Sequence, residues 1–221
     1  MAIRGILFDA SGVIYERPLV GVGLQTLLEH YGLRPRHPMV VHNALRAAEY
    51  DANVGRIGLD DYYDALLRVH GLTDERALAA GREALRFDAS RLTLSSSTVT
   101  AVRQLDRHDL RLGVIANTPY QAVDEIDWLS RMGIPGSVWT IYLTSCEMAM
   151  LLPDPTLLAD AVEQLGVLAI ETLLVSRNLD CLEIAAEQGL IPVAFHPNAP
   201  VPALWRHIEQ IDELSARLVR I

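Results

Sequence analysis

The residues of this chain best suited to chemistry follow short apolar runs. Asp9 and Asn117 each come directly after such a run, and the pair Ser176 and Arg177 follows a third. Carboxylate, amide, hydroxyl and guanidinium groups recognise polar or charged ligands. We therefore expect any ligand chemistry where these runs end.

The chain carries no lysine, because all 19 of its basic residues are arginine. This excludes a Schiff-base lysine and a phosphate-binding lysine of the P-loop type. A formal net charge of −9 argues against nucleic acid and anionic membrane surfaces as partners. No apolar run reaches the roughly 18 residues of a membrane span. We expect no cofactor and an unknown small molecule or protein as partner, and the oligomeric state stays open.

Cysteine and histidine add few candidates. The two cysteines, Cys146 and Cys181, cannot form a disulfide framework, and no histidine lies beside either of them to activate a thiol. With an N-terminus that runs straight into an apolar strand, they indicate a reduced, cytoplasmic protein. No pair of histidines or cysteines has zinc-ligand spacing. His196 follows a strand end and is kept as a candidate ligand-binding residue.

Strands and helices are predicted to alternate over most of the chain. This pattern predicts a parallel sheet covered on both faces, with ligands bound beyond the carboxyl ends of the strands. The expected strands are residues 3–8, 112–116, 138–143, 172–175 and 191–195. The expected helices are residues 95–107, a helix starting at Pro119, residues 153–166, a helix ending near 188, and residues 202–217.

A different pattern fills the stretch from about residue 19 to 90, where apolar residues recur at helical spacing without a strand signal. We therefore predict a doubly wound, Rossmann-like α/β core formed by residues 1–15 and 92–221. An all-helical cap, residues 16–91, is inserted into it.

The strand ends resemble the four motifs of the haloacid dehalogenase superfamily, over essentially the whole chain. The first family motif is an apolar strand followed by Asp-x-Asp-Gly-Thr/Val, and here Asp9-Ala10-Ser11-Gly12-Val13 is similar. The resemblance implies that Asp9 is the nucleophile. Ser11 stands in place of the aspartate that protonates the leaving group, a role that a hydroxyl cannot take near neutral pH.

The second and third motifs lack groups that bind an anion in the family. Ala116 occupies the hydroxyl position before Asn117, with Thr118 as a neighbouring hydroxyl that could replace it. Leu152 occupies the position of the lysine before Pro-Asp-Pro, and no shift of alignment restores a lysine. In a partly dry site the missing charge removes roughly several kcal/mol of interaction.

The fourth family motif supplies carboxylates that bind Mg²⁺. Arg177 and Cys181 stand at its two acidic positions, so the resemblance implies no metal site here. We expect the Arg177 guanidinium to pair with Asp9 in place of a metal. The alternative is an Arg177 side chain that points to solvent.

A narrower resemblance concerns metal-independent 2-haloacid dehalogenases, which drop the second aspartate of the first motif. Their fourth motif contains Val-Ser-Ser-Asn, and Val175-Ser176-Arg177-Asn178 is similar. They retain the serine and lysine that are missing here. On these grounds Ser176 and Asn178 join Ser11, Thr118 and His196 as candidate ligand-binding residues.

Three functions follow as hypotheses. The first is a protein that has lost Mg²⁺-dependent phosphatase chemistry and acts by binding a ligand or a protein partner. The second is a metal-independent hydrolase, in which Asp9 attacks an electrophilic carbon or acyl centre and Arg177 holds the substrate anion. Asn117 and Asn178 orient the intermediate. The third, an ordinary Mg²⁺ phosphatase, has the least support because four motif groups are missing together.

Overall fold

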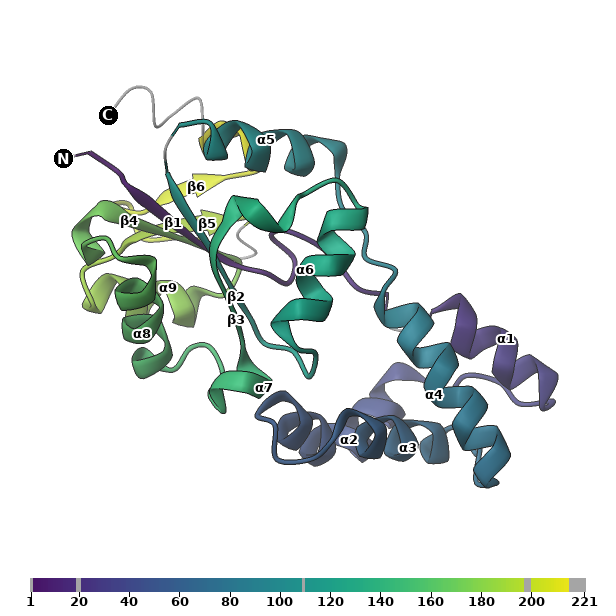
Figure 1. Cartoon of the computed structure of the whole chain (residues 1–221). Helices are drawn as coiled ribbons and strands as arrows, with labels where there is room; N and C mark the ends of the chain where they lie inside the picture. The colour runs from purple at the N-terminus through teal and green to yellow at the C-terminus, as the bar shows by residue number, and fades with distance from the viewer. Residues whose placement is uncertain (1, 19–20, 109, 197–199, 215–221) are drawn as a thin grey trace.

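One sheet of six parallel strands forms the centre of the computed structural model, which describes residues 2–18, 21–108, 110–196 and 200–214 (Figure 1). The strands lie in the order β3-β2-β1-β4-β5-β6. The five strands predicted from the sequence are confirmed. Each is an apolar run that is buried on both faces of the sheet. The bounds are β1 Gly5–Asp9, β2 Arg111–Ala116, β3 Trp139–Thr144, β4 Thr172–Ser176, β5 Ile191–Phe195 and β6 Arg206–Ile208.

Alternate side chains of β1 enter two separate apolar cores. Ile6 and Phe8 pack on the face covered by α5 and α6, and Leu7 packs on the face covered by α8 and α9. All three are fully buried, and burying one such side chain contributes about 1.5–3 kcal/mol. The helices of this part are α5 Ser96–Asp106, α6 Ala122–Arg131, α7 Ser145–Met148, α8 Pro155–Leu165 and α9 Leu179–Glu187, with short 3₁₀ turns at Gly136–Val138 and Ala169–Glu171.

Strand register places the candidate residues side by side. Asp9, the last residue of β1, lies opposite Ile115 of β2, and Phe8 lies opposite Val175 of β4. Because parallel strands end at the same edge, Asp9 falls next to Ser176, and Asn117 lies just beyond Ile115 on the adjoining strand. Asp9 and Ser176 are therefore in contact, and Asn117 follows the strand beside β1.

Polar side chains cap the helices that follow the strands. Ser95 accepts a hydrogen bond from the backbone N–H of Thr98 at 3.0 Å and thereby caps α5. Asp154 caps α8, which begins at Pro155 and not at the predicted residue 153. An aspartate that caps the helix, followed by a proline at its first position, is a strong helix start. This pair therefore sets the boundary of α8.

Four helices between the first and second strands form a unit beside the sheet (Figure 1). Leu24, Leu28, Leu67 and Leu78 form its small apolar core. Two connections join it to the sheet, and they pair through backbone hydrogen bonds of 2.9 Å between Glu16 and Thr93. The predicted helical insertion is thus present, whereas its role as a cap stays a prediction. The helices are α1 Val22–His30, α2 Pro38–Asn53, α3 Leu59–Val69 and α4 Glu75–Ala89.

Two further predicted helices differ from the structure. The helix predicted over residues 202–217 is wrong, because residues 206–208 form β6 and residues 215–217 lie outside the described part. Ile208 pairs with Phe195 and is buried, so pairing with the otherwise open edge of β5 overrides the helical spacing of the apolar residues. The other helix, α6, begins at Ala122, three residues after the predicted start at Pro119.

Among the described residues, the helices are all too short or too polar to cross a membrane.

Asp88 joins the end of α4 to the start of α1. Its two carboxylate oxygens accept hydrogen bonds from the backbone N–H groups of Gly23 at 2.7 Å and Leu24 at 2.8 Å. These N–H groups belong to the first turn of α1 and have no partner within the helix. A Cβ atom on Gly23 would lie 3.0 Å from the Asp88 carboxylate, so the glycine permits this close approach.

Replacing Asp88 is therefore expected to destabilise the helical unit. Asp88→Ala should lower the free energy of unfolding by about 2–4 kcal/mol, because two buried N–H groups lose their acceptor. Asp88→Asn keeps one oxygen and should lose about half as much. Urea unfolding followed by circular dichroism measures both, with Asp74→Ala, which removes the exposed cap of α4, as the control. A loss for Asp88→Ala no larger than that of the control would contradict the assignment.

Candidate active site at the carboxyl ends of the strands

Asp9 is held by a serine on the neighbouring strand. The hydroxyl of Ser176 donates a hydrogen bond to Asp9 Oδ2 at 2.6 Å, and the same hydroxyl oxygen accepts from the backbone N–H of Asn178 at 3.0 Å. The bond from Asn178 directs the hydroxyl proton of Ser176 toward the carboxylate. Ser176 is fully buried, so this arrangement is fixed by the end of β4.

The second carboxylate oxygen of Asp9 has no hydrogen-bond partner among the described residues. Trp139 Nε1 is the one sealed side-chain polar atom without a partner in that part of the chain, so Asp9 Oδ1 keeps contact with solvent. No described arginine or histidine lies within ion-pair distance of Asp9. Burial therefore raises the pKa of Asp9 to about 6, although the hydrogen bond from Ser176 opposes the rise. The carboxylate is mostly ionised at neutral pH.

The expected ion pair between Arg177 and Asp9 is wrong. The Arg177 guanidinium lies 3.5 Å from the Glu16 carboxylate, and both side chains are exposed. The Arg177 stem passes over Gly12, where a Cβ atom would lie 2.9 Å from Arg177 Cδ. Ser176 takes the inward position at the end of β4, so Arg177, the next residue, turns outward and keeps its charge hydrated.

Asn117 serves the backbone of the loop after β3. Its amide nitrogen donates to the Leu152 carbonyl at 2.9 Å, and its amide oxygen accepts from the Leu152 N–H at 2.8 Å. Leu152 itself is buried in the core beside Leu7. The amide predicted to orient an intermediate is therefore committed to the backbone, and an apolar side chain fills the lysine position.

The two residues flanking Asn117 are both buried. Ala116 belongs to the core. The Thr118 hydroxyl donates to Glu125 at 3.0 Å, and the Thr118 backbone exchanges hydrogen bonds with Ser145. Its hydroxyl is thus engaged, so the prediction that Thr118 could replace the missing motif hydroxyl is wrong.

The remaining predicted residues form no hydrogen bond or ion pair with Asp9 in the described part of the chain. Ser11 is exposed in the turn after β1, and Asn178 caps α9 by accepting from the N–H of Asp180 at 2.9 Å. His196 pairs with Glu209, with 2.6 Å between Nδ1 and Oε2. Cys181 is buried, and this burial together with the charge of Asp9 raises the pKa of its thiol to about 12.

The donors near Asp9 do not fit Mg²⁺. The family positions hold Asp9, the neutral thiol of Cys181 and the outward-turned Arg177, and Mg²⁺ needs several oxygen ligands in an octahedral set. No group of three or more His, Cys, Asp or Glu side chains within the described ranges could hold a metal ion.

A buried ion pair beside the site was missed by the sequence analysis. Arg17 Nη2 lies 2.7 Å from Glu125 Oε1, and Glu125 is fully buried. The guanidinium also lies over the ring of Tyr120, with its carbon 4.5 Å from the ring centre, and the Tyr142 hydroxyl donates to Glu125 at 3.3 Å. A charged residue on the apolar stripe of α6, four residues before Leu129, was the available signal, because such a residue needs a partner.

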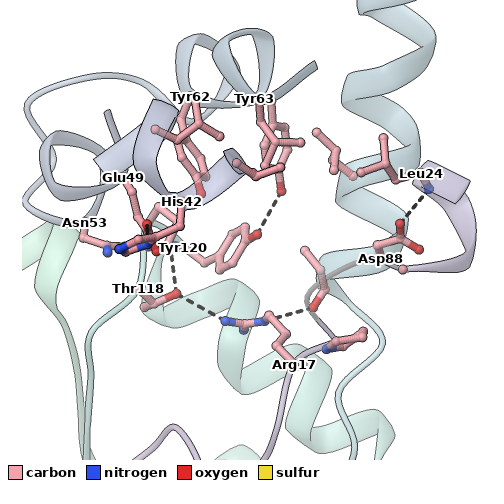
Figure 2. A pocket seen from close by; sticks show the side chains of 18 of the residues that line it. Arg17, Leu24, His42, Glu49, Asn53, Tyr62, Tyr63, Asp88, Thr118 and Tyr120 are labelled. Carbon is pink, nitrogen blue, oxygen red and sulfur yellow. Dashed lines mark hydrogen bonds and ion pairs between the residues drawn. The ribbon is translucent and has the colours of Figure 1, made fainter. Parts of the chain in front are cut away.

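A cavity of about 350 Å³ separates the four-helix unit from the loop after β2. In Figure 2, Tyr62 and Tyr63 enter it from α3, and Thr118 and Tyr120 form the opposite side. The hydroxyls of Tyr63 and Tyr120 are hydrogen-bonded at 3.2 Å, which links the helical unit to the core. Asp9 does not line this cavity.

A second cavity, of about 450 Å³, lies on the other side of the segment that follows Asp9. Arg177, Glu16 and His196 line it, together with hydroxyls at the start of α5. The segment of residues 12–18 thus borders both cavities, with Arg17 facing the first and Glu16 the second.

Breaking the buried pair should be costly. Glu125→Gln is expected to lower the free energy of unfolding by about 3 kcal/mol, because Arg17 is left without its counter-charge in a largely buried position. Replacing both partners together, Arg17→Met with Glu125→Leu, should restore much of the loss. Chemical unfolding measures this, with Asp127→Asn, which breaks the exposed pair with Arg131, as a control that should cost less than about 0.5 kcal/mol. Equal losses for Glu125→Gln and Asp127→Asn would contradict a dominant buried pair.

The raised pKa of Asp9 predicts a pH-dependent cost in stability. The folded chain binds the Asp9 proton more tightly than the unfolded chain, so the free energy of unfolding should fall as pH rises from about 4 to about 6. Asp9→Asn removes this term and should be more stable than wild type by about 3 kcal/mol at pH 7, with little difference at pH 4. Unfolding at several pH values measures the difference, with exposed Asp180→Asn as the control. A difference that does not grow with pH would contradict the buried, unpaired carboxylate.

Known proteins resemble the chain in structure and not in sequence. No protein-family model matches the chain, and no curated protein matches it in sequence. A 2-haloacid dehalogenase from Pseudomonas syringae pv. Tomato DC3000 superposes with a TM-score of 0.70 at 16% identity, over 99% of each chain. A defluorinating L-2-haloacid dehalogenase gives 0.72 at 20% identity, over 98% of this chain and 95% of its own. A HAD-family enzyme from Bacteroides thetaiotaomicron gives 0.66 at 16% identity, over 90% and 96%.

These likenesses extend over nearly the whole chain and concern its fold. The chain therefore has the fold of the haloacid dehalogenase superfamily, as its strand-end motifs predicted.

Proposed function

We propose that this protein is a metal-independent hydrolase in which Asp9 attacks an electrophilic carbon of an organic substrate. One observation carries the proposal. Asp9 Oδ2 is held at 2.6 Å by Ser176, and Oδ1 is unpaired and in contact with solvent. A carboxylate that is fixed at one oxygen and free at the other is arranged for nucleophilic attack. The dehalogenase names of several structural neighbours support this choice over binding without turnover.

The reaction has two balanced steps. In the first, Asp9 Oδ1 forms a bond to the substrate carbon, and the leaving group departs as an anion with the electron pair of the broken bond. In the second, water attacks the Asp9 carbonyl carbon of the ester, which releases the substrate alcohol, restores the carboxylate and gives one proton to solvent. For an activated ester, the same attack at the acyl carbon forms an anhydride with Asp9, which water cleaves.

Ser176 and Arg177 have separate roles in this proposal. Ser176 holds the carboxylate in one orientation and is a positioning residue. Arg177 supplies positive charge at the edge of the site, where its exposed pair with Glu16 is weak enough for a substrate anion to displace Glu16. Asn117 holds the Leu152 backbone and thereby shapes the site.

In this proposal the helical unit acts as a cap. Residues 16–91 leave the core and return to it through paired connections at Glu16 and Thr93, next to the carboxyl ends of the strands. A cap at this edge covers the site and limits the entry of water, which strengthens electrostatic interactions inside it.

Binding without turnover is the second candidate, and one observation favours it. Asp9 has no cation beside it, because Leu152 replaces the family lysine and Arg177 turns to Glu16. An anionic leaving group would then gain little stabilisation from the protein. In this candidate the cavity beneath the helical unit binds a ligand or organises a protein partner, and Asp9 has no chemical role.

Isotope labelling at Asp9 tests the proposal directly. The protein is incubated with 2-haloacids and with 4-nitrophenyl esters in water enriched in ¹⁸O, with a chelator present. We expect ¹⁸O in the peptide that contains Asp9, since water attacks the carboxyl carbon of the covalent ester. The turnover rate should rise with pH through about 6, because the ionised carboxylate is the nucleophile.

Two variants complete the test. Asp9→Asn should lower turnover by about 10³-fold, as expected for the loss of a nucleophile, and Asp180→Asn should leave it unchanged. Turnover that survives in Asp9→Asn would overturn the proposal. Absence of both turnover and labelling over a broad substrate screen favours the binding candidate. Mg²⁺-dependent hydrolysis of an aryl phosphate that is lost in Asp9→Asn would contradict both.

A further inference from the structure

One face of α3 lines the cavity along much of its length. Tyr62, Leu66 and His70 recur every fourth residue, so their side chains lie in a row on one face, and the row spans about 12 Å at about 1.5 Å per residue. Leu45 of α2 lines the same cavity. The cavity therefore has an apolar middle between the Tyr62 and His70 levels.

His70 directs an unpaired N–H into this cavity. It is 2% exposed, and its Nδ1 accepts a hydrogen bond from the backbone N–H of Arg36 at 3.1 Å. Burial, and then the nearby charge of Arg36, lower the pKa of His70, so the ring is neutral and carries its proton on Nε2. Nε2 has no partner among the described residues, and it is not among the sealed polar atoms, so it opens to the cavity that His70 lines.

Arg36 is an exposed arginine that lines the same end of the cavity, so its guanidinium lies at the cavity's solvent edge. Every other charged side chain that lines the cavity has a partner. Arg17 is paired with Glu125, His42 with Glu49, and Asp88 with the start of α1. Arg36 forms no ion pair within the part of the chain that the structure describes, and it lines the cavity beside His70.

The opposite end of the cavity belongs to the core. Asn117, Thr118 and Tyr120 line it there, and Figure 2 shows Thr118 and Tyr120 facing Tyr62 and Tyr63 across the space. Asn117 follows the strand that lies beside β1. A ligand that fills the cavity thus has one end near the candidate site and the other at Arg36 and His70.

We propose that Arg36 and His70 form a subsite for the terminal carboxylate of an elongated organic acid. The apolar chain of this acid lies against Leu45 and Leu66, and its far end reaches the loop after β2. A guanidinium and a single N–H from a second side chain match the two oxygens of a carboxylate. That the occupant is the substrate rests on the proposed function, whereas the binding subsite does not.

Calorimetric titration of the Asp9→Asn protein tests the subsite without turnover. Octanoate is the probe, and octanamide, of equal length and without charge, is the matched ligand. We expect octanoate to bind at least about 10-fold more tightly, because a charge-assisted hydrogen bond replaces a neutral one. Arg36→Gln should remove this preference by weakening octanoate about 10-fold and leaving octanamide unchanged. Arg34→Gln, which alters a neighbouring exposed arginine outside the cavity, should change neither.

A pair of substitutions separates the two nitrogens of His70. Asn at this position can still accept the bond from the Arg36 backbone but lacks the Nε2–H, so His70→Asn should weaken octanoate about 5-fold or more. His70→Gln places a donor near Nε2 and should retain more of the affinity. Equal affinity for octanoate and octanamide, or a preference that survives Arg36→Gln, would overturn the subsite.

The outcome is distinguishable from that of the proposed function. Selective binding of octanoate, with no incorporation of ¹⁸O into Asp9 of the wild type, supports the subsite and refutes the proposed hydrolase. Labelling of Asp9 by short substrates, without any preference for octanoate, supports the hydrolase and removes the subsite.

Discussion

A buried ion pair between Arg17 and Glu125 positions the parts that meet at the candidate site. Glu125 is sealed from solvent, and its partners are Arg17, 2.7 Å away, and the hydroxyls of Thr118 and Tyr142. The same guanidinium donates to the Ala89 carbonyl and lies over Tyr120. Arg17 precedes the helical unit and Ala89 ends it, so one side chain fixes both connections against the loop after β2. Residues of that loop line one side of the cavity.

Asp9 differs from Glu125 because it has no ion-pair partner among the described residues. Its only partner among the described residues is the Ser176 hydroxyl, and no cation lies beside it. Burial therefore disfavours the ionised form, and the ionised carboxylate lowers the stability of the folded chain. A carboxylate that the fold does not neutralise remains available to react, and such groups collect at functional sites. Leu152 and the outward turn of Arg177 have the same effect, since each withholds positive charge from Asp9.

The cavity and the strand ends offer two kinds of recognition within one fold. Near Asp9 the binding groups are few and partly exposed. Inside the cavity Leu45 and Leu66 form an apolar middle, and Arg36 and His70 line the far end. The hydrogen bond between Tyr63 and Tyr120 connects the helical unit to the loop after β2. An elongated ligand would use both, which is why chain length and terminal charge are natural axes of selectivity.

The apolar runs by themselves determined the five main strands, because a strand buried on both faces needs no partner information to be recognised. They also placed Asp9 at a strand end and showed that no positive charge stands at Leu152. Register then brought Ser176 beside Asp9, as expected from parallel strand ends.

Only the tertiary structure decided which polar groups pair. Arg177 bonds to Glu16, Asn117 bonds to the Leu152 backbone, and residues 206–208 join the sheet edge although their spacing suits a helix. Each outcome depends on groups far apart in the chain that compete for one partner, and on the solvation that each would lose. Local sequence sets backbone preference and apolar periodicity, whereas the choice of a partner for a charge is made by the fold as a whole.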